Sequence, residues 1–382
     1  MIYFLSGKLS YAQLYSKVVE TLKQDIIKEA EWALKQNPET ITSYPAPRSA
    51  GGKHDFSSEG DYWWPDPLHP DSAYIQRDGQ TNPDNFTAHR LVMIRFSRIM
   101  GALASAYKIT RDEKYVKACV KHADAWFKDE LTRMNPHLLY AQSIKGRVTG
   151  RGIGIIDTIH LMEVSQALLI ISKSKKVDLD IYKEWFKQYL QWLTTHPYGL
   201  AEMNAANNHG TCWVMQVAAF AKFTGDEKLM AFCRDRFKNK LLPDQMAING
   251  SFPLELNRTK PYGYSIFNLD AMVMIAQILS TGKTDLYSFQ TPDGKSLKKG
   301  LEFLFPYLND KNQWPYPKDV MYWDEWPVAQ PCLLFGARAY GIHPWFETWQ
   351  KGDHQPAEAE VIRNLPIRNP LLWITDRETG ED

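Results

Sequence analysis

The segment Ala104-Ser-Ala-Tyr-Lys-Ile-Thr-Arg-Asp-Glu-Lys-Tyr-Val-Lys-Ala-Cys119 returns in altered form as Ala218-Ala-Phe-Ala-Lys-Phe-Thr-Gly-Asp-Glu-Lys-Leu-Met-Ala-Phe-Cys233. Each copy has an apolar stretch, a Thr at a turn, and acidic residues where a second stretch begins, which is the pattern of two helices joined by a tight turn. The two threonines are 114 residues apart, and a related turn begins at Thr281, 57 residues after Thr224. Because 114 is twice 57, the three turns fit one repeat of 57 residues, and this predicts a repeated αα-hairpin.

Two further segments fit the same interval. Residues 171–174 stand near the midpoint between Thr110 and Thr224, and Gly341 stands about one interval after Thr281. Apolar residues also recur at helical steps of three and four in two of the expected helices: Leu91, Ile94, Phe96, Ile99, Leu103 and Tyr107, and Ile159, Met162, Val164, Ala167, Leu168 and Ile171. We therefore expect an all-α fold, either an open solenoid or a closed (α/α) toroid, interrupted by long loops at 44–86 and 242–262.

The composition is that of a globular protein with a large core. The chain has 382 residues, of which 44% are hydrophobic and 13% aromatic, and we expect residues 1–382 to form a single domain. A net charge of +1 gives no overall field that would attract nucleic acid or an acidic membrane. A site for a polyanion must therefore be a local basic patch.

Other classes of site are not indicated. The four cysteines are widely spaced without a C-x-x-C pair and are expected to be buried thiols. No two histidines stand three or four residues apart, and no glycine-rich segment has a phosphate-loop ending, so neither a metal nor a cofactor is expected. No apolar run approaches the roughly 18–20 residues that span a bilayer. Residues 1–5 resemble the remnant of a secretory signal, although the stretch is short and has no basic leader.

The residue types needed for proton abstraction beside a carboxylate occur between positions 207 and 264. The chain reads Asn207-Asn208-His209, later Glu255-x-x-Arg258, and then Tyr262-Gly-Tyr264. An amide, an imidazole, a guanidinium and a phenol can together bind an acid group, stabilise charge that develops on it, and move a proton at the neighbouring carbon. This grouping predicts an enzyme that acts on uronic-acid polymers by β-elimination.

Each of these residues also has a purely structural interpretation. The asparagines are good helix caps, and Arg258 stands at the right spacing for an ion pair with Glu255 on a helix. Tyr262 and Tyr264 have the character of core aromatics. Two other functions also stay open: a glycoside hydrolase that uses carboxylates such as Asp157, Asp324 or Glu325, and a non-catalytic sugar-binding repeat protein.

Several separated motifs resemble those of the alginate lyase superfamily, in the same order, over about residues 45 to 340. Besides the segments around Asn208 and Arg258, they are Gly60-Asp-Tyr-Trp-Trp-Pro-Asp-Pro67, Arg77-Asp-Gly-Gln-x-Asn-Pro-Asp84, Asn135-Pro-His-Leu-x-Tyr-Ala-Gln142 and Gly154-Ile-Ile-Asp-Thr158. Within that superfamily the chain is most similar to Bacteroides-type mannuronan and glucuronan lyases.

The resemblance favours the toroid over the solenoid, with the substrate cleft on its concave face. It implies that Asn208, His209 and Arg258 neutralise the C6 carboxylate and that Tyr264 serves as base and acid, with Tyr262 as the alternative. It also implies an anionic polysaccharide as partner and a periplasmic or secreted protein. The residues expected to bind substrate combine cations with aromatic rings and are Lys53, His54, Trp63, Trp64, Arg77, Tyr140, Gln142, Arg151 and Tyr262.

Overall fold

The repeated hairpins of the sequence form successive pairs of helices in the computed structural model, which describes residues 10–174 and 177–375. The pairs are α2 (Ala88–Thr110) with α3 (Glu113–Phe127), α4 (Leu161–Ile171) with α5 (Asp180–Thr195), α7 (Asn208–Thr224) with α8 (Glu227–Arg236), α11 (Pro261–Leu279) with α12 (Leu297–Asn309), and α13 (Pro331–Tyr340) with α14 (His343–Lys351). The turns fall where the repeat predicts them. Gly225 and Gly341 end their helices with φ of 77° and 68°, a backbone conformation that glycine adopts without a steric penalty.

The first helix of each pair lies inside and the second outside. The inner helices α2, α4, α7, α11 and α13 contact one another in that order, and almost every residue of α7 and α11 is buried. A helix that is apolar on all sides is suited to such a position. Outer helices such as α3 and α5 instead bury a single stripe and expose the other face.

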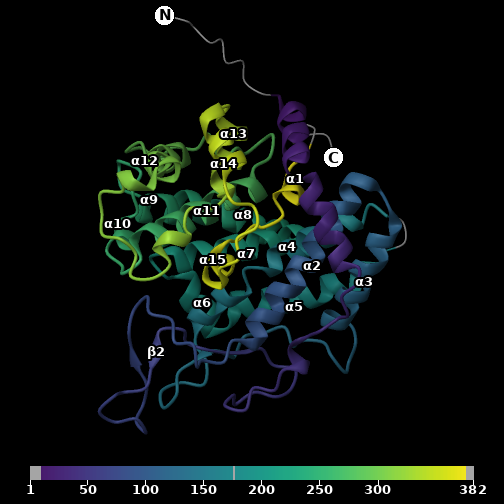
Figure 1. Cartoon of the computed structure of the whole chain (residues 1–382), viewed down its shortest axis with the longest axis vertical. Helices are drawn as coiled ribbons and strands as arrows, with labels where there is room; N and C mark the ends of the chain where they lie inside the picture. Colours follow the sequence, from purple (N-terminus) through teal and green to yellow (C-terminus); the bar gives the residue numbers. More distant parts are fainter. Residues whose placement is uncertain (1–9, 175–176, 376–382) are drawn as a thin grey trace, which may run out of the picture.

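The helix α1 (Tyr11–Ala33) closes the ring. It packs along α2, while its Tyr11 ring lies 4.4 Å from the Arg338 guanidinium of α13 and its Thr21 accepts a hydrogen bond from Gln350 of α14. The first and last hairpins are thereby joined, and the fold is an (α/α) toroid (Figure 1).

The C-terminal segment crosses the centre of the ring. Its short 3₁₀ helix, Pro370–Trp373, presents backbone carbonyls to three inner helices. Lys108 of α2 donates to the carbonyl of Leu371, Gln166 of α4 to that of Leu372, and Gln277 of α11 to that of Trp373. These bonds fix the position of the chain that returns from the last hairpin.

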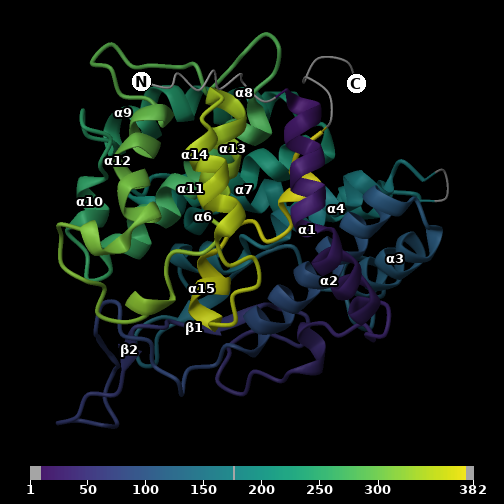
Figure 2. The same ribbon diagram turned by 45° about the horizontal axis from the view of Figure 1, so that its top comes forward.

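Long loops cover the end of the ring at which the inner helices begin (Figure 2). They hold two small sheets: β1 (Ser57–Glu59) pairs in parallel with β4 (Tyr140–Ser143), and β2 (Trp63–Trp64) pairs antiparallel with β3 (Ile75–Gln76). The shorter helices α6 (Pro197–Met203), α9 (Leu242–Gln245), α10 (Pro253–Leu256) and α15 (Ala359–Asn364), with the 3₁₀ segment Gly152–Thr158, complete this region.

Two predictions about classes of site can be compared with the described residues. The four cysteines are free and buried, as the sequence predicts. No single helix among the described residues is long and apolar enough to cross a membrane; one bent pair, Gly152–Thr158 with Leu161–Ile171, passes on length and composition alone.

Replacing a core aromatic of an inner helix should destabilise the ring. Phe220 of α7 is fully buried, with its ring centre 5.0 Å from that of Phe186 and 5.7 Å from that of Tyr189. We expect Phe220→Ala to lower the free energy of unfolding by about 3–5 kcal/mol, because it leaves a cavity between two hairpins. Phe232→Ala, on a side chain that is 41% exposed, is the control and should cost less than about 1 kcal/mol. Equal effects of the two changes in thermal or denaturant unfolding would contradict this assignment of the core.

Candidate active site

The four residues predicted to be catalytic lie in one cleft at the beginnings of α7 and α11. Asn208 and His209 open α7, Arg258 precedes α11, and Tyr264 lies in its first turn. The cleft is lined by Asp61, Tyr62, Trp63, Gln76, Asp78, Gln142, Arg151, Ile153, Ile156, Asn208, His209, Arg258, Tyr264, Phe267, Arg363 and Asn364. Residues up to 303 positions apart in the sequence therefore share this space.

His209 is held by a buried carboxylate. Its Nδ1 lies 2.6 Å from Oε1 of Glu202, which is 2% exposed. A carboxylate in this position favours the tautomer with the proton on Nδ1 and fixes the orientation of the ring. The other ring nitrogen, Nε2, is therefore the one available to a ligand.

Asn208 is held in the same way by Glu255. The backbone N–H and Nδ2 of Asn208 each donate to this carboxylate at 2.7 Å, and both residues are buried. The helix cap is Asn207, whose side chain accepts from the His209 backbone N–H, so capping accounts for one asparagine and leaves Asn208 to face the cleft. Burial raises the pKa of Glu255, and the hydrogen bonds from Asn208 act in the opposite direction.

Arg258 is fixed by Asp78 of the long loop instead of by Glu255. Its Nη2 and Nε donate to the two oxygens of Asp78 at 2.7 and 3.1 Å. The structural alternative, an i,i+3 ion pair with Glu255, does not hold, because the carboxylate that Arg258 binds in a bidentate manner is that of Asp78. The Arg258 guanidinium also lies 4.4 Å from the centre of the Tyr264 ring.

Tyr264 carries a hydroxyl that is buried in a polar environment. It donates to the hydroxyl of Tyr62 at 2.9 Å and lies 3.4 Å from Nη2 of Arg258. Burial raises the pKa of Tyr264 well above its usual value, and Tyr62 adds to the rise, whereas Lys260 and Arg258 act to lower it. Burial outweighs the two cations in the free protein, so the neutral phenol is the resting form.

Buried ion pairs join the loop to the ring beneath the cleft. Asp61 pairs with Arg90 of α2 at 2.6 Å and with Arg363 of α15 at 2.8 Å. Arg90 also pairs with Asp157 at 3.1 Å, and Asp157 accepts a hydrogen bond from Ser58 at 2.6 Å. Although burial acts in the opposite direction, Arg363 and Arg90 hold the pKa of Asp61 well below its usual range.

Lys260 and Glu360 extend this network toward the tyrosines. Lys260 pairs with Glu360 at 2.7 Å, and Glu360 in turn pairs with Arg363 at 3.1 Å. The Lys260 ammonium lies 5.1 and 5.2 Å from the ring centres of Tyr62 and Tyr264. Burial alone would lower the pKa of Lys260, but Glu360 keeps it above its usual value, so the charge persists beside both phenols.

Known proteins share both the sequence pattern and the fold. The family model for alginate lyases matches residues 40–314. The chain belongs to the alginate lyase family. A crystal structure of an alginate lyase from Bacteroides ovatus matches with a TM-score of 0.78 and 32% identity, over 94% of this chain and 98% of that one. Alginate lyase A1-III from a Sphingomonas species matches with a TM-score of 0.53 and 16% identity over 88% and 89% of the two chains, which shows the shared fold.

A His-to-Ala variant of A1-III, complexed with a tetrasaccharide, matches with a TM-score of 0.55 and 17% identity over 88% of each chain. The curated proteins contain no match to this chain. Because the protein belongs to this family and has its fold, it is a polysaccharide lyase.

Three of the residues predicted to bind substrate lie in the cleft of this alginate lyase family member. Trp63 has the guanidinium groups of Arg147 and Arg151 at 5.1 and 5.7 Å from its ring centre. Arg151 donates to both the backbone carbonyl and the side-chain oxygen of Gln142. Gln142 has a positive φ of 49°, a conformation that is uncommon for a residue with a side chain, and Arg151 and Asp157 hold it there.

The other predicted substrate-binding residues do not line the cleft. Lys53 and His54 contact backbone carbonyls of the 131–133 loop, and Tyr140 packs against Gly51. Trp64 donates to the carbonyl of Gln80 and lies beneath the Arg77 guanidinium. Contact of these five with a longer polymer stays a prediction.

Tyr262 is a core residue, and its prediction as a site residue is wrong. It is fully buried, its ring packs against Trp314 and Trp323, and its hydroxyl donates to the carbonyl of Tyr307 at 2.9 Å. Two positions along a helix correspond to about 200° of rotation, so Tyr262 and Tyr264 cannot face the same space. Of the two tyrosines, Tyr264 is therefore the one that lies in the cleft.

Sequence reasoning missed the residues that hold the site. Tyr62 and Asp78 stand inside the motifs that carry the resemblance, and Glu202 precedes His209 by seven positions, about two helical turns, although α6 and α7 are separate helices. Lys260 lies between Arg258 and Tyr262, which were both predicted to be site residues. Arg363 had no sequence signal, because it lies beyond the segment that resembles the family.

The carboxylates proposed for a glycoside hydrolase are not placed for that chemistry. Asp157 is buried in the ion-pair network, and Asp324 and Glu325 lie in a 3₁₀ turn outside the cleft lining. The carboxylates that do line the cleft, Asp61 and Asp78, are each paired with arginine. In the part of the chain that the structure describes, no group of three or more His, Cys, Asp or Glu side chains could hold a metal ion.

Proposed function

We propose that this polysaccharide lyase cleaves β-1,4-linked polymannuronate, glucuronan or both by β-elimination. The observation that carries the proposal is the convergence of Asn208, His209, Arg258 and Tyr264 on one cleft, with the first three each held by a carboxylate. Groups that are oriented before substrate arrives pay no reorganisation cost as charge develops. The side chains alone are assigned the neutralisation of the substrate carboxylate, without a metal or cofactor.

The assigned roles follow from the chemistry of a uronate. The C5 hydrogen is acidified by the C6 carboxylate, so its removal requires that the carboxylate charge be neutralised while a base takes the proton. The imidazolium form of His209, paired through Nδ1 with Glu202 and donating from Nε2, would bind the carboxylate and the intermediate that forms from it. The second hydrogen on Nδ2 of Asn208 and the Arg258 guanidinium would bind the same group. An acid must then protonate O4 as the glycosidic bond breaks.

Stereochemistry favours Tyr264 for both proton transfers. In β-D-mannuronate and β-D-glucuronate the C5 hydrogen and O4 are gauche, so one group on one face can reach both. The high pKa of Tyr264 suits donation to O4, and the same pKa means that the phenolate needed to accept the C5 proton is a minor form at neutral pH. In L-guluronate the two groups are anti, and His209 would then serve as base with tyrosine as acid.

The expected partner is an anionic polysaccharide. Two variants of A1-III are complexed with a tetrasaccharide, and in this chain Trp63, Gln142 and Arg151 offer an aromatic face and polar groups beside the catalytic cluster. We further propose, from the family resemblance, that the protein acts in the periplasm or outside the cell. Residues 1–382 are proposed to form a single domain.

Ultraviolet absorbance distinguishes elimination from the other functions. We expect incubation with polymannuronate or glucuronan to produce an absorbing C4–C5 double bond, with less or no product from polyguluronate and hyaluronan. A hydrolase would instead give saturated ends without absorbance. A sugar-binding protein would leave the polymer length unchanged by size-exclusion chromatography, and either result would refute the proposal.

Loss of one charge-stabilising group should impair catalysis without unfolding the protein. We expect His209→Ala and Arg258→Ala each to lower turnover of polymannuronate by about 10²-fold or more, the scale for removing a preorganised donor. His354→Ala and Arg133→Ala, which lie outside the cleft lining, are matched controls. Near-normal kcat for either cleft variant, with unchanged circular dichroism, would remove that residue from the proposed site.

The two tyrosines provide a matched pair. We expect Tyr264→Phe to lower kcat by about 10²–10⁴-fold or more while polymer still binds, because only the hydroxyl is lost. Tyr262→Phe removes a hydrogen bond to the Tyr307 carbonyl, so it should cost about 1 kcal/mol of stability and leave kcat nearly unchanged. If Tyr264→Phe keeps its activity in the absorbance assay, the base lies elsewhere, with His209 the next candidate.

A further inference from the structure

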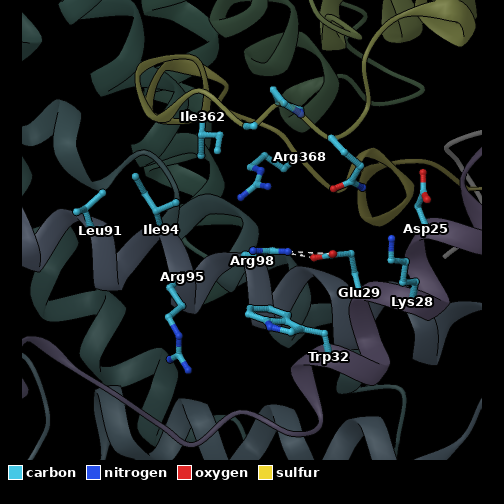
Figure 3. A pocket seen from close by; sticks show the side chains of 13 residues that line it. Asp25, Lys28, Glu29, Trp32, Leu91, Ile94, Arg95, Arg98, Ile362 and Arg368 are labelled. Atoms are coloured by element: carbon cyan, nitrogen blue, oxygen red, sulfur yellow. Dashed lines mark hydrogen bonds and ion pairs between the residues drawn. The ribbon is translucent and has the colours of Figure 1, made fainter.

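A second hollow, with a volume of about 560 Å³, lies on the flank of the ring. Its walls come from α1, α2 and the chain between residues 355 and 368 (Figure 3). Four cationic side chains line it, namely Lys28, Arg95, Arg98 and Arg368, against the two carboxylates of Asp25 and Glu29. In a protein with a net charge of +1, this is a local excess of positive charge.

Arg98 is held rigidly on one wall. Its Nε and Nη2 donate to the two oxygens of Glu29 at 2.7 and 2.9 Å, and its guanidinium lies 4.1 Å from the centre of the Trp32 ring. Arg95 is also occupied, because it donates to the side chain of Gln36 at 3.0 Å. Neither of these cations lacks a partner within the protein.

Arg368 differs from them. The Glu163 carboxylate, which acts to raise the pKa of Arg368, accepts from the backbone N–H of Arg368 and from the backbone and side chain of Asn369. Among the residues that the structure describes, no carboxylate forms an ion pair with the Arg368 guanidinium. Burial lowers the pKa of Arg368, which is the energetic signature of a charge removed from water without full compensation. An anion bound in the cavity would provide that compensation.

The remaining wall is apolar. Ile94 lies one turn before Arg98 on α2, Ile362 lies across the cavity from that helix, and Leu91, 51% exposed, stands at the edge (Figure 3). A ligand that fits must therefore combine an anionic group with a less polar face. A sugar ring that carries a carboxylate has both, since its ring C–H groups form an apolar face.

The cavity and the active-site cleft lie on opposite sides of α15. Ile362 lines the cavity, whereas the next two residues, Arg363 and Asn364, line the cleft. Successive residues of a helix point about 100° apart, so one short helix separates the two spaces, a thickness of about 10–12 Å. A polymer that leaves the cleft past α15 could reach the cavity with a nearby sugar unit.

We propose that this cavity is a second binding site for a uronate unit of the polysaccharide, with Arg368 as the group that binds its carboxylate. The proposal rests on the proposed function for the identity of the polymer. Binding of one chain at two sites raises the effective concentration of substrate at the cleft. Polymer should benefit from this second site, and oligosaccharides too short to span both sites should not.

Kinetics with substrates of two lengths test the proposal. We expect Arg368→Ala to raise KM for the polymer by about tenfold, the scale for losing a hydrogen bond to a charged group, with kcat unchanged. KM for a tetrasaccharide should stay the same, and Arg368→Lys should recover part of the polymer effect. Lys117→Ala, which removes an exposed charge on α3 outside the cavity, is the matched control. An Arg368→Ala variant that matches this control with polymer would overturn the proposal.

Calorimetry gives a readout that does not depend on turnover. In the Tyr264→Phe background, titration with a uronate tetrasaccharide should show two sites, and addition of Arg368→Ala should leave one. A single site in both proteins would refute the second site even if elimination is confirmed. If inorganic phosphate competes for the Arg368-dependent site as well as the tetrasaccharide does, the cavity is a general anion site and the assignment to a sugar is wrong. Failure of the proposed function itself would appear separately, as the absence of ultraviolet-absorbing product from the unmodified protein.

Discussion

The buried ion pairs between Asp61, Arg90 and Arg363 are the constraint on which the rest of the site depends. They join the loop that carries the aromatic residues, an inner helix and the returning C-terminal chain at one point beneath the cleft. Through Asp157, Glu360 and Lys260 the network includes three carboxylates and three cations, so the charges balance in an environment that could not accept an unpaired one. Removing one member would leave its partners buried and uncompensated. The loop, α15 and the two phenols would then no longer be held in fixed positions relative to one another.

The cleft owes its chemistry to orientation more than to net charge. Glu202 fixes His209, Glu255 fixes Asn208 and Asp78 fixes Arg258, so much of the positive charge is already neutralised. What remains is a set of donors with defined directions in a cleft whose lining side chains are mostly buried or half-buried. Such an arrangement can favour the developing charge of an intermediate over the charge of the ground state, which is what catalysis requires. It also explains how a protein with almost no net charge would act on the polyanion proposed as its substrate.

The sequence predicts the ring well and the site in part. The hairpin turns at Thr110 and Thr224 are local patterns, since helical periodicity and turn residues act over a few positions. Asn208, His209 and Tyr264 lie on helices that the repeat already defines and Arg258 lies directly before one of them, so the four are brought together as predicted. Lys53 and His54 lie in a loop whose path depends on distant contacts, and the choice between Tyr262 and Tyr264 needed the helix phase. Arg363 reaches the cleft only because the C-terminal chain returns across the ring, which no local pattern reveals.

The central claim is that the C6 carboxylate of the sugar to be cleaved binds at Asn208, His209 and Arg258 with its C5 hydrogen facing residue 264. A crystal structure of the Tyr264→Phe protein with a mannuronate tetrasaccharide tests this directly. The account predicts carboxylate oxygens within hydrogen-bond distance of His209 Nε2 and the Asn208 amide, with C5 and the glycosidic O4 of that same sugar both over the ring at position 264. A carboxylate bound away from these three residues, or C5 directed to the opposite face, would contradict it.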